Sequence, residues 1–160
     1  MIAKKSPLTY VQFYLLSSDY EFVDGEPDKY ENIETELFNQ YEIEIDFVNN
    51  LKDDNDFNLY TRISVNYGKN KLPGHSLRIE GTGLFELNKE NLNPDVINNL
   101  STLSALTMMI SSIRGYIMNL TGYSPMGKFV LPSLDINDII RQKNEKKKRQ
   151  KKKPSEPNIE

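Results

Sequence analysis

The chain has 160 residues, of which 38% are hydrophobic and 27% charged, and its formal net charge is −3. This length suffices for one hydrophobic core, which favours a single domain. Because the chain has no cysteine, its composition excludes disulfides, zinc-thiolate sites and cysteine nucleophiles. The apolar run near the N-terminus is interrupted by polar residues, so we expect neither a signal peptide nor membrane insertion, and a cytoplasmic protein.

Charge is distributed unevenly along the chain. Up to Ile140 there are 11 Lys and Arg against 20 Asp and Glu, and from Arg141 onward there are nine against three. This asymmetry predicts an acidic folded domain, residues 1–140, and a basic tail, residues 141–160. The tail is expected to be mostly disordered, with a helical start as an alternative.

Four strands are predicted. Leu8–Leu16 is rich in β-branched and aromatic residues, and alternation of apolar and polar residues indicates Ile33–Phe47, Phe57–Tyr67 and Ser76–Leu87. The first two are separated by a loop rich in aromatic residues, and the second has acidic residues on its outer face. Gly81 and Gly83 share the core face of the fourth strand. They leave a hollow that favours close approach of another backbone, which we interpret as a helix.

That helix is predicted to follow directly, because Asn93 is a good N-cap and Pro94 suits the first helical position. An apolar stripe runs along it at spacings of three and four: Val96, Leu100, Leu103, Leu106, Ile110, Ile113, Ile117 and Leu120. A second row of small or flexible residues accompanies the stripe and suits a close neighbour: Ser104, Met108, Ser111, Gly115 and Met118.

An irregular apolar segment follows, and then a short helix capped by Asp135 or Asn137, with its apolar residues in the first turn and a half. Together these elements predict an α+β fold. It consists of a four-stranded antiparallel meander sheet packed by one long helix, plus a short C-terminal helix.

No motif in the sequence predicts an enzyme or a cofactor. His75 lies in a turn without a recognisable catalytic partner, and Gly81–Gly83 lacks the third glycine and the lysine of a phosphate-binding loop. Glu42, Glu44 and Asp46 alternate along one strand, which is more typical of a solvent face than of a calcium or magnesium site. We expect no catalytic residues, no bound metal and no cofactor.

Two irregular segments hold many apolar side chains, around Tyr20 to Tyr30 and from Tyr123 to Ile136. Either they close the sheet and helix, or they form a partly exposed groove that binds unfolded chain through adaptable methionine and aromatic contacts. The basic run Lys146–Lys153 suits nucleic-acid phosphates or an anionic membrane surface. A solubilising terminus is favoured, because no aromatic residue accompanies the run to stack on bases.

Three stretches in succession resemble the SecB family of export chaperones: Gly81–Leu87, Ser112–Ile117 and Gly127–Ile136. The resemblance implies the same α+β fold and homotetramers built as dimers of dimers, with long helices between the sheets. The second helical row, Ser104 to Met118, would then contact another subunit. Members of the family hold unfolded precursor proteins in an apolar groove near the early crossover loop and the two helices.

The resemblance also nominates site residues. Those expected to contact a client are Tyr20, Phe22, Tyr30, Met126, Phe129, Leu131, Leu134, Ile136 and Ile140. The acidic outer sheet face is similar to the surface that docks the SecA motor, here Glu42, Glu44, Asp46 and Glu80. Two features depart from the pattern, since the tail is rich in lysine rather than acidic and the chain has no tryptophan for the crossover loop. Some SecB-like proteins are instead dedicated chaperones of toxin–antitoxin systems.

The sequence therefore predicts an ATP-independent holdase for unfolded polypeptide, with either preproteins for export or a dedicated client, such as one of a toxin–antitoxin pair. One alternative is a nucleic-acid-binding adaptor that works through the basic tail. Another is a purely structural interaction subunit with one fixed partner.

Overall fold

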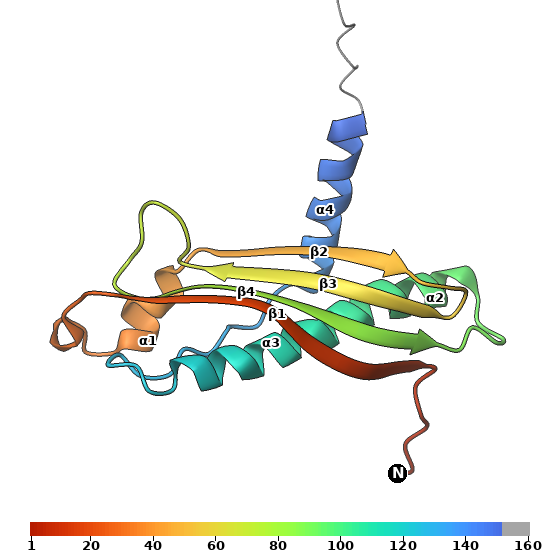
Figure 1. Cartoon of the computed structure of the whole chain (residues 1–160), viewed down its shortest axis with the longest axis horizontal. Helices are drawn as coiled ribbons and strands as arrows, with labels where there is room; N and C mark the ends of the chain where they lie inside the picture. The colour runs from red at the N-terminus through yellow and green to blue at the C-terminus, as the bar shows by residue number, and fades with distance from the viewer. Residues whose placement is uncertain (152–160) are drawn as a thin grey trace, which may run out of the picture.

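The computed structural model describes residues 1–151 and shows one twisted sheet with a long helix packed along it (Figure 1). The strands are β1 (Leu8–Val23), β2 (Ile43–Leu51), β3 (Asp56–Val65) and β4 (Gly74–Leu87). The helices are α1 (Ile33–Glu36), α2 (Pro94–Asn99), α3 (Ala105–Thr121) and α4 (Ile136–Lys151). Short 3-10 turns at Pro27–Lys29 and Phe38–Gln40 flank α1.

The predicted α+β class is confirmed, and the strand order adds one feature. Strands lie in the order β1-β4-β3-β2, and every neighbouring pair is antiparallel. The meander therefore comprises β2, β3 and β4, whereas β1 pairs with β4 and not with β2. The segment between β1 and β2 crosses from one edge of the sheet to the other and carries α1 (Figure 1). Both β1 and β2 are edge strands.

Two predicted strand boundaries are wrong. β1 continues to Val23 through part of the expected loop, with register shifts between Tyr10 and Gln12 and between Leu15 and Ser17. The expected strand Ile33–Phe47 is helical in its first part, where the Asn32 side chain accepts a 3.1 Å hydrogen bond from the amide of Thr35. This is an N-cap, so the chain turns helical there before it enters β2 at Ile43.

The long helix begins at Pro94 and is capped by Asn93, whose side chain accepts a 2.9 Å hydrogen bond from the amide of Val96. A π-helical stretch, Leu100–Ser104, separates α2 from α3. A π-helical turn contains more residues than an α-helical turn, so residues spaced by three and four no longer lie on one face of the helix across it. Val96 is accordingly 39% exposed. The buried side of α3 consists of Ala105, Leu106, Met109, Ile110, Ile113, Ile117 and Thr121.

By length and composition alone, the continuous helix Pro94–Thr121 is apolar enough to cross a membrane. In this chain its apolar side belongs to the core, where it packs with the inner residues of β3 and β4.

Gly81 and Gly83 create the predicted hollow, but side chains and not a helix backbone fill it. A Cβ atom on Gly83 would lie 2.5 Å from the sulfur of Met109 and 2.9 Å from the ring of Tyr10. A Cβ atom on Gly81 would lie 2.5 Å from the ring of Phe13. The long helix therefore occupies the hollow at Gly83 through the Met109 side chain of α3.

The C-terminal helix starts where the sequence predicts it, because the Asp135 carboxylate accepts a 3.0 Å hydrogen bond from the amide of Asp138. It is longer than expected and runs to Lys151, through the proposed domain boundary at residue 140. The described part of the expected disordered tail is thus helical. Residues 152–160, including the end of the basic run, lie outside the described residues.

Candidate functional site

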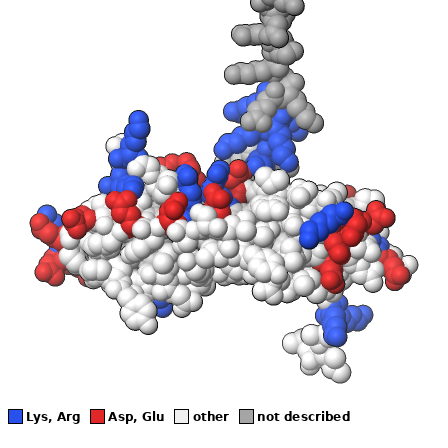
Figure 2. Space-filling view, viewed as in Figure 1, with Lys and Arg blue, Asp and Glu red and all other residues white. Residues whose placement is uncertain are grey.

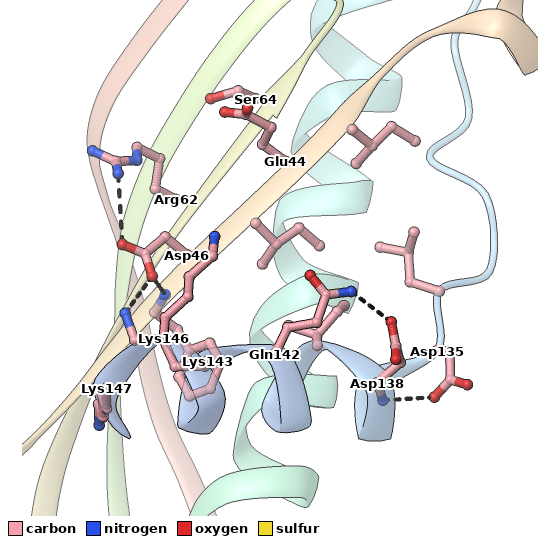
Figure 3. Close-up of a pocket in the computed structure, with 15 residues that line it drawn as sticks. Glu44, Asp46, Arg62, Ser64, Asp135, Asp138, Gln142, Lys143, Lys146 and Lys147 are labelled. Carbon is pink, nitrogen blue, oxygen red and sulfur yellow. Dashed lines mark hydrogen bonds and ion pairs between the residues drawn. The ribbon is translucent and has the colours of Figure 1, made fainter. Parts of the chain in front are cut away.

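A groove of about 730 Å³ lies between the edge strand β2 and helix α4 (Figure 3), and we call it the β2–α4 groove. Its apolar lining is half-buried and comes from both sides: Ile43, Ile45 and Phe47 of β2, Leu134 before α4, and Ile139 of α4. Its polar lining consists of Glu44, Asp46, Arg62, Ser64, Asp135, Asp138, Gln142, Lys143, Lys146 and Lys147.

The apolar wall on β2 exists because β2 has a neighbouring strand on one side only. Ile43, Ile45 and Phe47 pair with Val65, Ile63 and Thr61 of β3, so their side chains lie on the same sheet face as the core. At an inner strand they would be covered completely, whereas at the edge they remain half-exposed toward the groove. Covering exposed apolar surface of this kind with an apolar ligand is favourable, because it removes that surface from water.

Helix α4 is attached to β2 through Lys143. The Lys143 ammonium donates a hydrogen bond to Asp46 and lies 5.7 Å from the centroid of the Phe47 ring. Arg62 contacts the same carboxylate at 3.6 Å and Glu80 at 3.8 Å. Partial burial raises the pKa of Asp46, but the hydrogen bond from Lys143 and the nearby cations outweigh it and hold the pKa below its usual value.

The sequence pattern of α4 explains this attachment. Ile136, Ile139 and Ile140 are half-buried, and the same spacing of three and four continues as Lys143 and Lys147. Lysine stems cover apolar surface while their charges stay in water, so the apolar side of the helix continues into the lysines. Sequence reasoning assigned these lysines to the tail and missed them as groove residues, although their spacing carried the signal.

The segment before α4 is held in place by α3. Arg114 donates two hydrogen bonds to it, from Nε to the Leu131 carbonyl at 2.9 Å and from Nη2 to the Pro132 carbonyl at 3.0 Å. The Thr121 hydroxyl accepts a 3.0 Å hydrogen bond from the amide of Phe129. These contacts fix the direction in which the chain approaches Leu134 and the groove.

Three residues nominated for client contact are core residues in this segment. Met126, Phe129 and Leu131 are 5%, 2% and 1% exposed. Their expected role is corrected, because a buried side chain offers no surface to a ligand in this conformation. The apolar character of the segment serves mainly to close the core, which is one of the two interpretations that the sequence left open.

Tyr20, Phe22 and Tyr30 are half-buried against the core, and the first two pack around His75. His75 is completely buried, with Nε2 at 2.9 Å from the Gly127 carbonyl and Nδ1 at 3.2 Å from the Tyr20 hydroxyl. A carbonyl oxygen only accepts, so Nε2 carries the hydrogen and Nδ1 accepts from Tyr20. Burial lowers the pKa of His75.

Neighbouring Tyr41 completes this aromatic cluster. Its hydroxyl donates to the Pro73 carbonyl at 2.7 Å and accepts from the His75 amide at 3.0 Å. Burial raises the pKa of Tyr41 to about 12. The cluster joins the end of β1, the start of β4 and the segment after α3, and its polar groups are satisfied, so it has the character of a structural core.

The remaining nominated residues lie near α4. Leu134 lines the β2–α4 groove, Ile140 lines a smaller recess on the side of α4 that faces α2, and Ile136 is half-buried. The structure therefore divides the nominated set into residues near α4, aromatic residues at the crossover, and buried core residues. Ile43, Ile45 and Phe47 were not nominated, because their strand could not be recognised as an edge from the sequence.

The acidic set expected to dock a SecA-like partner is partly neutralised. Glu42 and Glu44 are exposed, but Asp46 and Glu80 both contact Arg62, and Asp46 also binds Lys143. Figure 2 shows acidic and basic side chains side by side at the base of α4. Among the described residues, no three His, Asp or Glu side chains are placed to hold a metal ion.

The second helical row lies away from the sheet. Ser111 and Gly115 are exposed, and Ser104, Met108 and Met118 are half-buried. A Cβ atom on Gly115 would meet nothing within 4 Å. This flank of the long helix therefore offers accessible surface in the described chain, and its role as a subunit interface stays a prediction.

The sequence matches no protein-family model and no curated protein. The structure is similar to the SecB-like chaperone Rv1957 of Mycobacterium tuberculosis, solved in complex with a ChAD peptide from the HigA1 antitoxin Rv1956. The TM-score is 0.55 at 13% identity, and the match covers 80% of this chain and 88% of that one. A protein of unknown function from Streptococcus agalactiae matches with a TM-score of 0.43 at 9% identity, over 79% of this chain and 97% of that one. The first of these matches shows that the chain has a SecB-like fold.

Proposed function

We propose that this protein is an ATP-independent holdase that binds non-native polypeptide in the β2–α4 groove. The observation that carries the proposal is the half-buried apolar lining contributed by Ile43, Ile45, Phe47, Leu134 and Ile139 on a SecB-like fold. An unfolded chain exposes apolar side chains that such a lining can cover, at about 25 cal/mol for each Å² removed from water. Binding of this kind needs neither nucleotide nor chemical catalysis.

The distribution of reactive side chains supports binding rather than catalysis. The one histidine of the sequence is buried in the aromatic cluster and does not line the groove, and the sequence contains no cysteine. Three of the charged groups that line the groove are engaged with one another, because Asp46 contacts both Lys143 and Arg62. Such an arrangement orients and anchors a ligand but provides no activated nucleophile.

A dedicated client, such as one member of a toxin–antitoxin pair, is the form of the proposal that we favour. The SecB-like chaperone of Mycobacterium tuberculosis was solved with a peptide from an antitoxin, which supports this alternative. General export through SecA receives less support, because two of the four expected docking carboxylates contact Arg62. We further propose that the protein works in the cytoplasm as a homotetramer that assembles through the exposed row around Ser111 and Gly115.

The proposal is tested by light scattering during dilution of a chemically denatured, aggregation-prone enzyme, without nucleotide. We expect stoichiometric protein to suppress the scattering and Leu134→Asp to weaken the suppression, since it places a charge on the groove lining. Val130→Asp is the matched control, because Val130 lies on the same segment, is 43% exposed and does not line the groove. No suppression by the unaltered protein, or equal loss in both variants, would contradict the proposal.

A further inference from the structure

Charge is separated along the β2–α4 groove. Figure 3 shows Lys146 and Lys147 on α4 toward the same end of the groove as Asp46 and Arg62, and Asp135 and Asp138 at the opposite end. An apolar floor thus has a basic end and an acidic end. A ligand that fits both features must place apolar groups on the floor and opposite charge at an end.

The acidic end is mostly engaged within the chain. Asp138 receives hydrogen bonds from Arg141 and from Gln142, the latter at 2.6 Å, and Asp135 caps the helix. Glu44 is the lining carboxylate outside these contacts, and it is exposed on β2. Asp135 and Asp138 therefore have little remaining capacity to bind a cationic ligand, whereas Glu44 keeps that capacity.

The basic end of the groove is less engaged within the chain than the acidic end. Lys143 is engaged by Asp46, but within the described part of the chain Lys146 and Lys147 make no ion pair, and both are exposed. They are followed on the same helix by Lys148 and Arg149. Two lysines that line an apolar groove without a carboxylate partner are complementary to a ligand that carries its own carboxylates.

We propose that Lys146 and Lys147 make the groove selective for polypeptide segments in which apolar residues are flanked on one side by Asp or Glu. This inference rests on the proposed holdase function and specifies its substrate class. The five apolar lining residues and the carboxylates at the far end favour a peptide over a nucleic acid, because they would leave a polyphosphate without partners and repel it.

The probes are two fluorescently labelled peptides with the same apolar core, one flanked on one side by three Glu and the other on the same side by three Lys. Their binding is measured by anisotropy with the full chain. Two exposed lysines predict that the Glu-flanked peptide binds about fivefold tighter at low salt. The preference should disappear near 0.5 M NaCl, where the Debye length is on the order of 4 Å.

The variant Lys146→Gln/Lys147→Gln is expected to bind both peptides equally. The control Lys148→Gln/Arg149→Gln removes the same charge from the same helix at positions that do not line the groove, and it should keep the preference. Circular dichroism and thermal melting are used to check that both variants retain the fold.

Equal binding of both peptides by the unaltered chain would overturn the selectivity and leave the holdase function standing. A preference that survives Lys146→Gln/Lys147→Gln would overturn the assignment to these lysines. Displacement of the Glu-flanked peptide by a single-stranded DNA oligonucleotide at equal concentration would favour a nucleic-acid ligand and overturn the inference. Binding of neither peptide, together with no suppression of aggregation, would overturn both proposals.

Discussion

The buried imidazole of His75 predicts a loss of stability between pH 7.5 and pH 5.5. His75 is completely buried, and burial lowers its pKa because the aromatic surroundings disfavour the cation. In the unfolded chain a histidine titrates near pH 6.5. On acidification the unfolded chain therefore takes up a proton that the folded chain does not, so the contribution is full above the unfolded pKa and is lost as the pH falls below it.

The magnitude follows from proton linkage. With an unfolded pKa of about 6.5 and a folded chain that stays neutral, the free energy of unfolding falls by at most about 1.4 kcal/mol over these two pH units. Protonation at Nδ1 would also deprive the Tyr20 hydroxyl of its acceptor, which is 3.2 Å away. The carbonyl of Gly127 accepts from Nε2 in either state.

Urea denaturation followed by circular dichroism, at one fixed protein concentration, measures the effect. His75→Gln is the comparison, because glutamine does not titrate and keeps a donor and an acceptor. We expect this variant to be less stable at pH 7.5, since the imidazole is lost from the cluster, but to lack the additional decline toward pH 5.5. Equal pH dependence in both proteins would show that His75 remains paired or hydrated as a cation in the folded state, and would refute the reasoning.

Three further substitutions test how the groove is supported. Gly83→Ala places a methyl group 2.5 Å from the sulfur of Met109 and should lower the free energy of unfolding by about 2 kcal/mol in urea denaturation; an unchanged midpoint would contradict the packing described. Arg114→Ala removes both hydrogen bonds to the segment before α4 and should cost about 1 to 3 kcal/mol. Hydrogen exchange should then accelerate over residues 128–135, whereas unchanged exchange there would show that the segment is held by its apolar contacts alone. Lys143→Ala breaks the ion pair with Asp46, whose side chain is 45% exposed, so the cost is only about 0.5 to 1 kcal/mol. Its signature is faster exchange in α4 with unchanged exchange in α3, and equal protection of α4 would mean that Lys143 does not anchor the helix.

Local sequence patterns were sufficient to predict a strand or helix where one face of that element is buried. The alternation in Phe57–Tyr67 and Ser76–Leu87 matches β3 and β4 closely, and the Asn93 cap marks the start of the long helix. The expected strand from Ile33 failed because Ile33 and Leu37 are also four residues apart, a helical spacing, and Asn32 caps that turn. Two periodicities coexist in this short stretch, and the cap decides between them.

The candidate site was less accessible to sequence reasoning because it depends on which strands are edges. Alternation identifies the buried side of Ile43 to Phe47 but not that β2 has one neighbour, which makes these residues a groove wall. Burial of Phe129 and Leu131 likewise depends on the path of the segment after α3, which Arg114 fixes through backbone carbonyls. Contacts to backbone carbonyls leave no pattern in a sequence. The lysines of α4 did leave a pattern, as a continuation of the isoleucine spacing.

Site-specific photo-cross-linking to an unfolded client tests the central claim most directly. A photoreactive amino acid is placed at Leu134, which lines the β2–α4 groove and is half-buried, or at Tyr123, which is 100% exposed on the same connecting segment. If the groove binds non-native polypeptide, the probe at Leu134 cross-links to the client and the probe at Tyr123 does not, despite its greater exposure. Cross-linking from Tyr123 but not from Leu134 would contradict the account.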